Sequence, residues 1–333
     1  MTKICVVGTT TWGTTLAIVY ASSGLEVTLL TRSTPETTLL EKNRKNSRFL
    51  PDVPFPNNLS VTNCSESAIN DSEIIIFAVP SNTLRQNLKK LSQNFKDTHI
   101  IVSATKGLEV QTSKRMSEVI KEEIQSVPKD QICAMSGPNL ATEIIRGKPS
   151  STVIASINLD CATFVQSALN SSKFRVYTNT DIIGVEIGGA LKNITAIATG
   201  ISDGLSLGDN AKASIITRGL SEMSRLGSCL GADRLTFSGL AGMGDLIATC
   251  SSNLSRNRMV GISLAKGIPI DTISMKMDNV AEGIGTTKAV IPIAQKHHIQ
   301  FPIGEAVYSI LFNGTNPSKV VELLMERRPR QEN

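Results

Sequence analysis

The stretch KICVVGTTTWG, which runs from Lys3 to Gly13, decides the fold of this chain. Its first five residues are nearly all apolar and mostly β-branched, as expected of a buried parallel strand. The glycine-rich turn that follows opens a helix predicted over residues 14–23, which Gly24 ends. A strand, a glycine turn and a helix in this order are the context of a dinucleotide-binding loop, because the helix N-terminus binds phosphate. The alternative is an ordinary turn between a strand and a helix.

The turn has the spacing of the GxGxxG fingerprint but lacks the middle glycine. Gly8 and Gly13 hold the first and third positions, which serve the tight turn and the packing of helix on strand. Thr10 holds the second position, where the backbone approaches the pyrophosphate. We therefore expect Gly8 and Gly13 to bind the cofactor. Either the pyrophosphate lies further from the backbone here, or the Thr10 hydroxyl takes part in binding it.

The residues that follow a second strand, predicted over 26–30, select the cofactor. An acidic residue at this point would bind the ribose 2′-hydroxyl. The sequence has Arg32 and Ser33 instead, and a guanidinium fork suits a 2′-phosphate. The cofactor is therefore expected to be NADPH or NADH, with NADPH favoured. The alternative for Arg32 is a solvated surface side chain.

The remaining pattern divides the chain into two halves. Further strands are predicted over 73–79, 99–104, 132–135 and 152–155, with a helix over 83–91 between the first two. Strands that alternate with helices imply a doubly wound parallel sheet of the Rossmann type. After about residue 181 helical periodicity dominates. The fold class is thus α/β, with an NAD(P)-binding domain over 1–180 and a mostly helical substrate-binding and catalytic domain over 181–333.

Composition limits the partners. The 333 residues are 41% apolar and 19% charged, which is typical of a globular protein. Aromatic residues are only 4%, so nucleic acid is not an expected partner, and the net charge of +5 suits a small anionic substrate. No apolar stretch reaches the length of a membrane span. Six scattered cysteines and three histidines indicate a cytoplasmic protein without a metal site. A homodimer is left open.

Lys192 is the first candidate for catalysis. Four small residues lie three and four positions away from it on a helix: Gly188, Gly189, Thr195 and Ala196. None of them is a carboxylate, and such a face lets a backbone or a ligand come close. Desolvation there would lower the pKa of Lys192, which prepares an amine to give and take a proton near neutral pH. The alternative is a structural lysine that reaches the surface from a packed helix.

Three further polar clusters have a similar character. Asp245 follows a glycine-rich turn, where it could also cap the next helix. Ser255, Arg256 and Asn257 offer hydroxyl, guanidinium and amide donors that suit a phosphate. Lys106 follows a predicted strand, at the sheet edge where ligands bind. Each cluster alone fits a structural role nearly as well as a functional one.

Taken in the order in which they occur along the chain, the motifs resemble those of the bacterial NAD(P)-dependent sn-glycerol-3-phosphate dehydrogenases. The resemblance covers almost the whole chain, and the ordered series is far more specific than any single match. Its landmarks are Gly8–Trp12–Gly13, AVPS over 78–81, KGLE over 106–109, SGPNLA over 136–141, GALKN over 189–193, GMGDL over 242–246, SRN over 255–257 and EG over 282–283.

The resemblance implies roles for individual residues, with Lys192 as the proton donor and acceptor. The implied contacts of glycerol 3-phosphate are Lys106, Gly137, Asn139, Lys192, Asp245, Ser255, Arg256 and Asn257. The implied NAD(P)H site contains Thr11, Trp12, Arg32, Lys106, Ala141, Arg256, Val280 and Glu282. Asn139 and Thr10 depart from the family pattern, since a small hydroxyl residue is common at the first and glycine at the second.

The implied reaction is reversible hydride transfer between dihydroxyacetone phosphate and sn-glycerol 3-phosphate, which supplies the latter for phospholipid synthesis. Lys192 would act as general acid and base, held by Asp245, while Arg256 and Asn257 would anchor the phosphate. Two alternatives are a dehydrogenase of similar build that acts on a carboxylate, and a dinucleotide sensor without catalysis. Retention of Lys192 and Asp245 argues against the sensor, which needs no proton donor.

Overall fold

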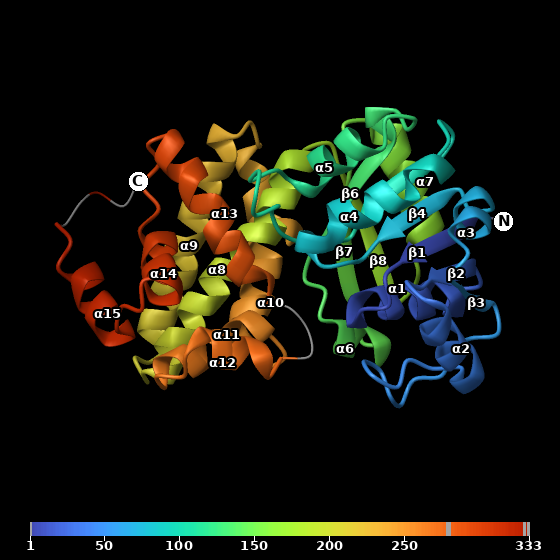
Figure 1. The fold of residues 1–333 in the computed structure, drawn as a ribbon. Coiled ribbons are helices and arrows are strands. Elements are labelled where there is room, and N and C mark those ends of the chain that lie inside the picture. The colour runs from blue at the N-terminus through green and yellow to red at the C-terminus, as the bar shows by residue number, and fades with distance from the viewer. Residues whose placement is uncertain (1, 278–280, 329–330, 332–333) are drawn as a thin grey trace.

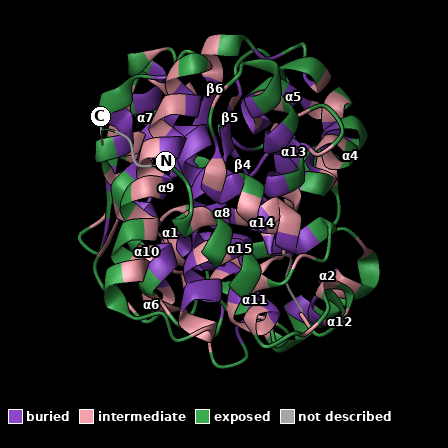
Figure 2. Cartoon of the chain, turned by 90° about the vertical axis from the view of Figure 1, so that its left-hand side faces the viewer, coloured by how far each residue is buried: buried purple, intermediate pink, exposed green. Residues whose placement is uncertain are grey.

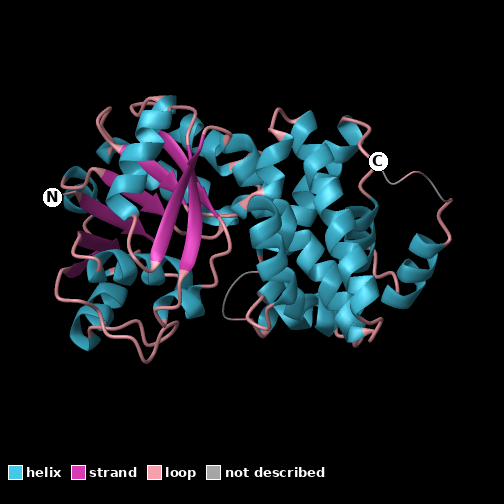
Figure 3. Cartoon of the chain, turned by 180° about the vertical axis from the view of Figure 1, so that it is seen from behind, coloured by secondary structure: helices cyan, strands magenta, loops and turns pink. Residues whose placement is uncertain are grey.

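The computed structural model describes residues 2–277, 281–328 and 331. A sheet with helices on both faces forms one half of the molecule, and a bundle of helices lies beside it (Figures 1 and 3). The strands are β1 Lys3–Val7, β2 Glu26–Leu30, β3 Leu59–Thr62, β4 Ile74–Phe77, β5 Ile100–Ser103, β6 Ile132–Ser136, β7 Ser150–Ala155 and β8 Phe174–Asn179. The helices of this half are α1 Thr11–Ser22, α2 Thr34–Asn43, α3 Ser65–Asn70, α4 Ser81–Leu91, α5 Met116–Glu123, α6 Ala141–Ile145 and α7 Leu159–Leu169.

The strand order β3-β2-β1-β4-β5-β6-β7-β8 confirms the predicted doubly wound class. The strands predicted over 3–7 and 26–30 coincide with β1 and β2. All four side chains of β4 are buried, because helices cover both faces of the sheet. The strand order reverses between β1 and β4, so the ligand crevice of such a sheet lies at the carboxyl ends of these two strands.

The expectation of a wholly parallel sheet is wrong at one pair. β7 runs antiparallel to β6, with Ser136 opposite Val153, and β8 continues parallel to β7. The connection from β6 to β7 contains only the five-residue α6, and an antiparallel pair does not need the longer helical crossover of a parallel one. The sequence reading also missed β3 and β8. Both are edge strands with alternating rather than continuous burial, so they lack the apolar run that marked the central strands.

The helical half is built around α8 Ile182–Gly204, most of whose residues are buried (Figure 2). In the described part of the chain the α-helices that follow it are α9 Asp209–Cys229, α10 Asp245–Ser251, α11 Arg256–Ala265, α12 Ile270–Met275, α13 Glu282–Lys296, α14 Pro302–Phe312 and α15 Pro317–Met325. Within the described ranges, α8 is the one helix long and apolar enough to cross a membrane, and 83% of its most apolar window is buried inside the molecule. It is the central core helix of this half.

Glycines let α11 approach α8 closely. A Cβ at Gly200 would lie 2.0 Å from the carbonyl oxygen of Arg258, and one at Gly261 would lie 2.1 Å from that of Ile197. These distances are too short for any side chain, so each helix presents bare backbone to the other. The contact positions the start of α11, which carries the predicted phosphate cluster, against the helix that carries Lys192.

We expect Gly261→Ala to lower the free energy of unfolding by about 1–3 kcal/mol, because the new methyl group must force the two helices apart. Gly244→Ala is the matched control, since a Cβ there meets only atoms at 3.6 Å or more and its φ of −60° is helical. Urea unfolding of both variants and the wild type measures the difference. Equal stability of Gly261→Ala and the wild type would show that the helices are not in tight contact.

Candidate active site

A cavity of about 420 Å³ lies between the carboxyl edge of the sheet and the helical half. Its walls come from the loops after β1, β4 and β5, the start of α6, and helices α8, α10 and α11. The lining residues are Thr10, Thr11, Trp12, Phe49, Ala78, Val79, Pro80, Ala104, Thr105, Lys106, Asn139, Leu140, Ala141, Thr142, Lys192, Asn193, Thr249, Leu254, Ser255, Arg256, Asn257 and Glu282. Most of the predicted site residues are therefore brought to one place.

The glycine loop forms one wall of this cavity. Gly8 has a φ of +114°, and a Cβ there would lie 2.9 Å from the carbonyl oxygen of Ala78. A Cβ on Gly13 would lie 2.0 Å from the carbonyl oxygen of Gly8. These contacts explain both glycines, because the first makes the turn and the third lets α1 pack on it. Neither lines the cavity itself, whereas Thr11 and Trp12 do.

Thr10 has a role that the sequence did not suggest. Its hydroxyl accepts a hydrogen bond from the Gly13 backbone N–H (3.1 Å) and donates one to the carbonyl oxygen of Ala78 (2.8 Å). It is therefore the N-cap of α1, which begins at Thr11, three residues earlier than predicted. Its φ of −65° is one that any residue adopts. The missing glycine thus reflects a side-chain cap that ties the loop to the end of β4.

Arg32 and Ser33 lie outside the cavity lining, at the start of the connection from β2 to α2. The side chain of Arg32 is 79% exposed, and its Nε lies 3.6 Å from a carboxylate oxygen of Glu36. Ser33 precedes α2 without capping it through its side chain. Their contact with a 2′-phosphate stays a prediction.

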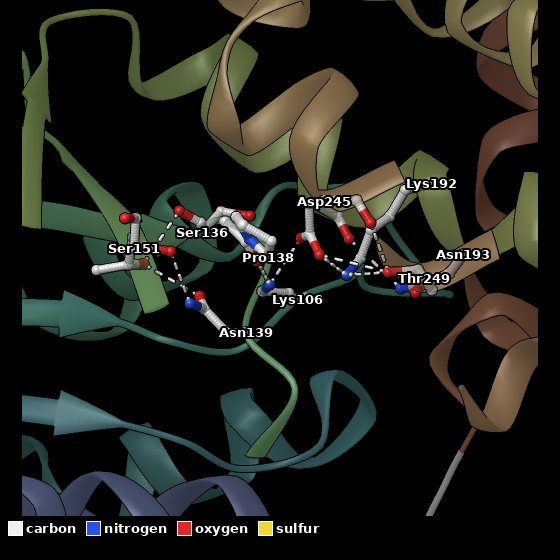
Figure 4. Close-up of polar contacts among 12 residues, drawn as sticks. Lys106, Ser136, Pro138, Asn139, Ser151, Lys192, Asn193, Asp245 and Thr249 are labelled. Carbon is white, nitrogen blue, oxygen red and sulfur yellow. Dashed lines mark hydrogen bonds and ion pairs between the residues drawn. The ribbon is translucent and has the colours of Figure 1, made fainter. Parts of the chain in front are cut away.

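Lys192 and Lys106 meet on one carboxylate. Asp245 at the start of α10 is 1% exposed and accepts hydrogen bonds from both ammonium groups (Figure 4). The distance from Lys106 Nζ to Asp245 Oδ2 is 2.7 Å, and Lys106 also donates to the carbonyl oxygen of Gly137 (2.9 Å). Lys192 donates in addition to the hydroxyl of Thr249 (2.9 Å). The Asp245 side chain therefore joins a loop of the sheet to α8, rather than capping α10.

The small residues beside Lys192 bring other backbone close to α8. A Cβ at Gly188 would lie 2.6 Å from the carbonyl oxygen of Ala241, and one at Gly189 would lie 2.4 Å from the Ser136 hydroxyl oxygen. Such close packing excludes water, and Lys192 is only 7% exposed. Burial lowers the pKa of Lys192 to about 8, although the Asp245 charge opposes the shift; the charge of Lys106 adds to it. A lysine with this pKa exchanges protons near neutral pH.

The Ser255–Asn257 cluster lies at the start of α11, on the cavity wall. The Ser255 hydroxyl caps the helix by accepting from the Arg258 N–H (3.3 Å). Asn257 donates to the side-chain oxygen of Asn193 (2.9 Å) and accepts from the Gly283 N–H (3.0 Å). Arg256 lies between them in sequence and its side chain reaches solvent in the cavity. Ser255 and Asn257 therefore hold the start of α11 in place, while Arg256 offers an accessible positive charge.

The other predicted residues take different positions. Asn139 lines the cavity and is tied to β7, donating to the Ser151 carbonyl oxygen and accepting from the Thr152 hydroxyl, both at 3.1 Å (Figure 4). Ala141, at the start of α6, also lines the cavity, whereas Gly137 does not. Val280 lies outside the described residues.

Glu282 contacts the loop after β4. Its carboxylate accepts hydrogen bonds from the backbone N–H (3.0 Å) and the hydroxyl of Ser81, at the start of α4. Burial raises the pKa of Glu282, while these two hydrogen bonds and the charge of Arg256 act against the shift. Glu282 therefore links α13 of the helical half to the edge of the sheet.

Several lining residues were not among the predicted site residues, and Thr249, Asn193 and Phe49 are examples. Thr249 lies one helical turn after Asp245, and that spacing was a usable signal. Asn193 follows Lys192 directly and faces Asn257. Phe49 comes from the segment between α2 and β3, and no local pattern places it here, because only the tertiary fold brings this segment to the cavity.

A dinucleotide loop at the switch point of a doubly wound sheet, facing a buried lysine with a lowered pKa, defines a nicotinamide-dependent oxidoreductase. The N-terminal and C-terminal family models of NAD-dependent glycerol-3-phosphate dehydrogenase match residues 3–162 and 181–322. The chain belongs to the NAD-dependent glycerol-3-phosphate dehydrogenase family.

Individual relatives agree with this membership. A protein of Dehalococcoides mccartyi named glycerol-3-phosphate dehydrogenase (NAD(P)+) is 47% identical over 333 residues, 100% of this chain and 93% of the relative. One of Chlorobium phaeobacteroides with the same name is 46% identical over 99% of each chain. The crystal structure of glycerol-3-phosphate dehydrogenase from Coxiella burnetii superposes with a TM-score of 0.93 at 38% identity, covering 98% of this chain and 99% of that one.

We expect Asp245→Asn to lower the free energy of unfolding by about 3–5 kcal/mol, because it removes the charge that compensates two lysines, one of them deeply buried. Asp52→Asn, at an exposed loop position, is the control for loss of one negative charge. Urea unfolding at pH 7 is the measurement. If both variants were equally stable, Asp245 would not be the carboxylate that compensates these charges.

Proposed function

We propose that this chain interconverts dihydroxyacetone phosphate and sn-glycerol 3-phosphate with NADH or NADPH, and that Lys192 is the general acid and base. The single observation that carries the proposal is the placement of Lys192. It is a buried amine with a pKa of about 8, held by Asp245, on the wall of a cavity that also contains the glycine-loop residues and Arg256. Family membership supports the same substrate pair.

The glycine loop fits a dinucleotide. The first residues of α1, Thr11 and Trp12, lie at the cavity, and Gly8 and Gly13 allow the tight turn that brings the start of this helix there. The indole Nε1 of Trp12 is buried and has no hydrogen-bond partner among the described residues, so a polar group of a ligand could satisfy it. When bound here, the reduced nicotinamide supplies the hydride. The cofactor contacts that we propose in the cavity are Thr11, Trp12, Ala141 and Glu282. We also propose contacts from Arg32, Ser33 and Val280, which are not among the described lining residues.

Lys192 handles the proton. In the reducing direction its ammonium donates a hydrogen bond to the substrate carbonyl oxygen and transfers a proton as the alkoxide develops. In the oxidising direction the neutral amine removes the hydroxyl proton. Asp245 and Thr249 orient the Nζ atom, while Lys106 adds a second cation near the developing oxygen charge.

We place the substrate phosphate at the start of α11. Arg256 offers a guanidinium that is accessible from the cavity, and the helix N-terminus adds oriented N–H groups. Ser255 and Asn257 line the same wall. The proposed substrate contacts on the sheet side are Asn139 and Gly137. Binding the phosphate away from the reacting carbon gives energy that positions the carbonyl at Lys192.

We further propose that residues 1–180 form the NAD(P)-binding domain and 181–333 the substrate-binding and catalytic domain. Support comes from the last strand, which ends at Asn179, and from the family models, which separate between 162 and 181. The cellular role we propose is supply of glycerol 3-phosphate for phospholipid synthesis in the cytoplasm. A homodimer is supported by large exposed apolar side chains around edge strand β8, namely Ile157, Leu159, Phe164 and Tyr177.

The direct test is oxidation of NADH and NADPH with either dihydroxyacetone phosphate or a 2-keto acid as substrate. We expect turnover with the phosphate substrate and little with the keto acid, because Arg256 and Lys106 provide the charge for a phosphate dianion. Turnover on the keto acid alone would favour the carboxylate dehydrogenase that the sequence left as an alternative.

We expect Lys192→Ala to lower kcat at least ~100-fold while the protein stays folded, the usual scale for loss of a general acid or base. Lys296→Ala, at an exposed position near the end of α13, controls for loss of a lysine elsewhere. Steady-state kinetics with dihydroxyacetone phosphate give the comparison. Near-normal turnover of Lys192→Ala would remove this residue from the proton transfer.

The pH dependence should have opposite signs in the two directions. Reduction needs the Lys192 ammonium, so kcat/KM for dihydroxyacetone phosphate should be level below pH 8 and fall as pH rises above it. Oxidation needs the neutral amine, so kcat/KM for glycerol 3-phosphate should rise through pH 8 and then level off. Initial rates over this range, with enzyme stability checked at each pH, measure both. Profiles that moved in the same direction would contradict the role of Lys192.

A further inference from the structure

A carboxylate from α2 lies beside the carboxyl end of β2, where the residues that directly follow the strand include no acid. In dinucleotide-binding sheets an acidic residue at this point accepts the ribose 2′-hydroxyl, and a nearby arginine accommodates the 2′-phosphate. The residues directly after β2 are Thr31, Arg32 and Ser33, with no acid among them. The acid comes instead from Glu36, in the first turn of α2.

Hydrogen bonds turn the Glu36 carboxylate back toward the glycine loop. One oxygen accepts from the hydroxyl of Thr9 (2.6 Å), and the other accepts from the backbone N–H of Arg32 (3.3 Å). The Nε atom of Arg32 lies 3.6 Å from the second oxygen. The carboxylate therefore bridges the loop after β1 and the residue that the sequence assigned to the 2′-phosphate.

This position adjoins the cofactor wall of the cavity. Thr9 stands between Gly8 and Thr10, and Thr10 and Thr11 line the cavity. The Gly8 N–H donates to the carbonyl oxygen of Leu30, the last residue of β2, so the loop and the strand end are held together. The Glu36 side chain is 22% exposed, so it is not sealed inside the protein.

We propose that Glu36 is a specificity-determining residue that favours NADH and opposes NADPH. Its carboxylate has acceptor capacity for a ribose hydroxyl, whereas the same negative charge repels a 2′-phosphate. The inference rests on the proposed cofactor site and adds a second determinant to Arg32.

The two side chains then act on cofactor choice in opposite directions. The Arg32–Glu36 pair is largely exposed on the arginine side, and such pairs are weak, so Arg32 can turn to a 2′-phosphate at little cost. Arg32 therefore permits NADPH, and Glu36 limits the preference that the sequence predicted from Arg32 alone. Glu36 therefore changes the ratio of the affinity for NADH to the affinity for NADPH.

The test measures binding of NADH and of NADPH to the full chain without substrate. Trp12 is the single tryptophan and lines the cavity, so its fluorescence reports both cofactors directly. We expect Glu36→Gln to raise the ratio Kd(NADH)/Kd(NADPH) at least ~10-fold, because a like charge near the 2′-phosphate is lost. Glu36→Lys should raise it further, and Glu36→Asp, which keeps the charge, should stay closer to the wild type.

Glu41→Gln is the matched control, since it removes the same charge from an exposed position on α2. Its ratio should equal that of the wild type. A ratio in Glu36→Gln and Glu36→Lys within threefold of the wild type would overturn the inference, as would an equal shift in Glu41→Gln. Because no substrate is present, failure of the enzyme to turn over dihydroxyacetone phosphate would overturn the proposed reaction without affecting this result.

Discussion

One buried carboxylate, shared by two lysines, holds this active site together. Asp245 comes from α10, Lys192 from α8 and Lys106 from the loop after β5, so the contact joins both halves of the molecule at the cavity. A buried carboxylate is costly by itself and so is a buried ammonium. Each is tolerated here because the other is present, and the surplus positive charge that remains suits an anionic substrate.

Close backbone packing makes this arrangement possible. Gly188 and Gly189 bring the π-helical segment Leu240–Gly244 and the end of β6 against α8, and Gly200 and Gly261 bring α11 against the same helix. Side chains at these positions would separate the elements that carry Lys192, Asp245 and Arg256. The same packing excludes water from Lys192, and this desolvation is the main cause of its lowered pKa. Stability and proton transfer therefore depend on the same contacts.

The sequence predicted the local parts of this picture and missed the parts that only tertiary contact creates. Apolar runs predicted the buried central strands. The family motifs placed Lys192 and Asp245 at one site. The edge strands β3 and β8 had no such run, and the run in β7 did not reveal that this strand is antiparallel to β6. The bond from Thr10 to the carbonyl oxygen of Ala78 and the contact of the Glu36 carboxylate with Thr9 were also missed, because each depends on a partner on another element. The spacing of small residues around Lys192 predicted its desolvation, whereas the sharing of Asp245 between Lys192 and Lys106 could not be read from spacing along the chain.

The most direct test is titration of the Lys192 ammonium by NMR in enzyme labelled at the lysine ε-carbons, with Lys192→Met used to assign its signal. We expect a pKa near 8 in the wild type and a lower pKa in Asp245→Asn, because the opposing negative charge is lost. Titration of Lys192 near its ordinary value of 10.5 would contradict this expectation, since burial between the two halves would then have no effect on the proton that the reaction moves.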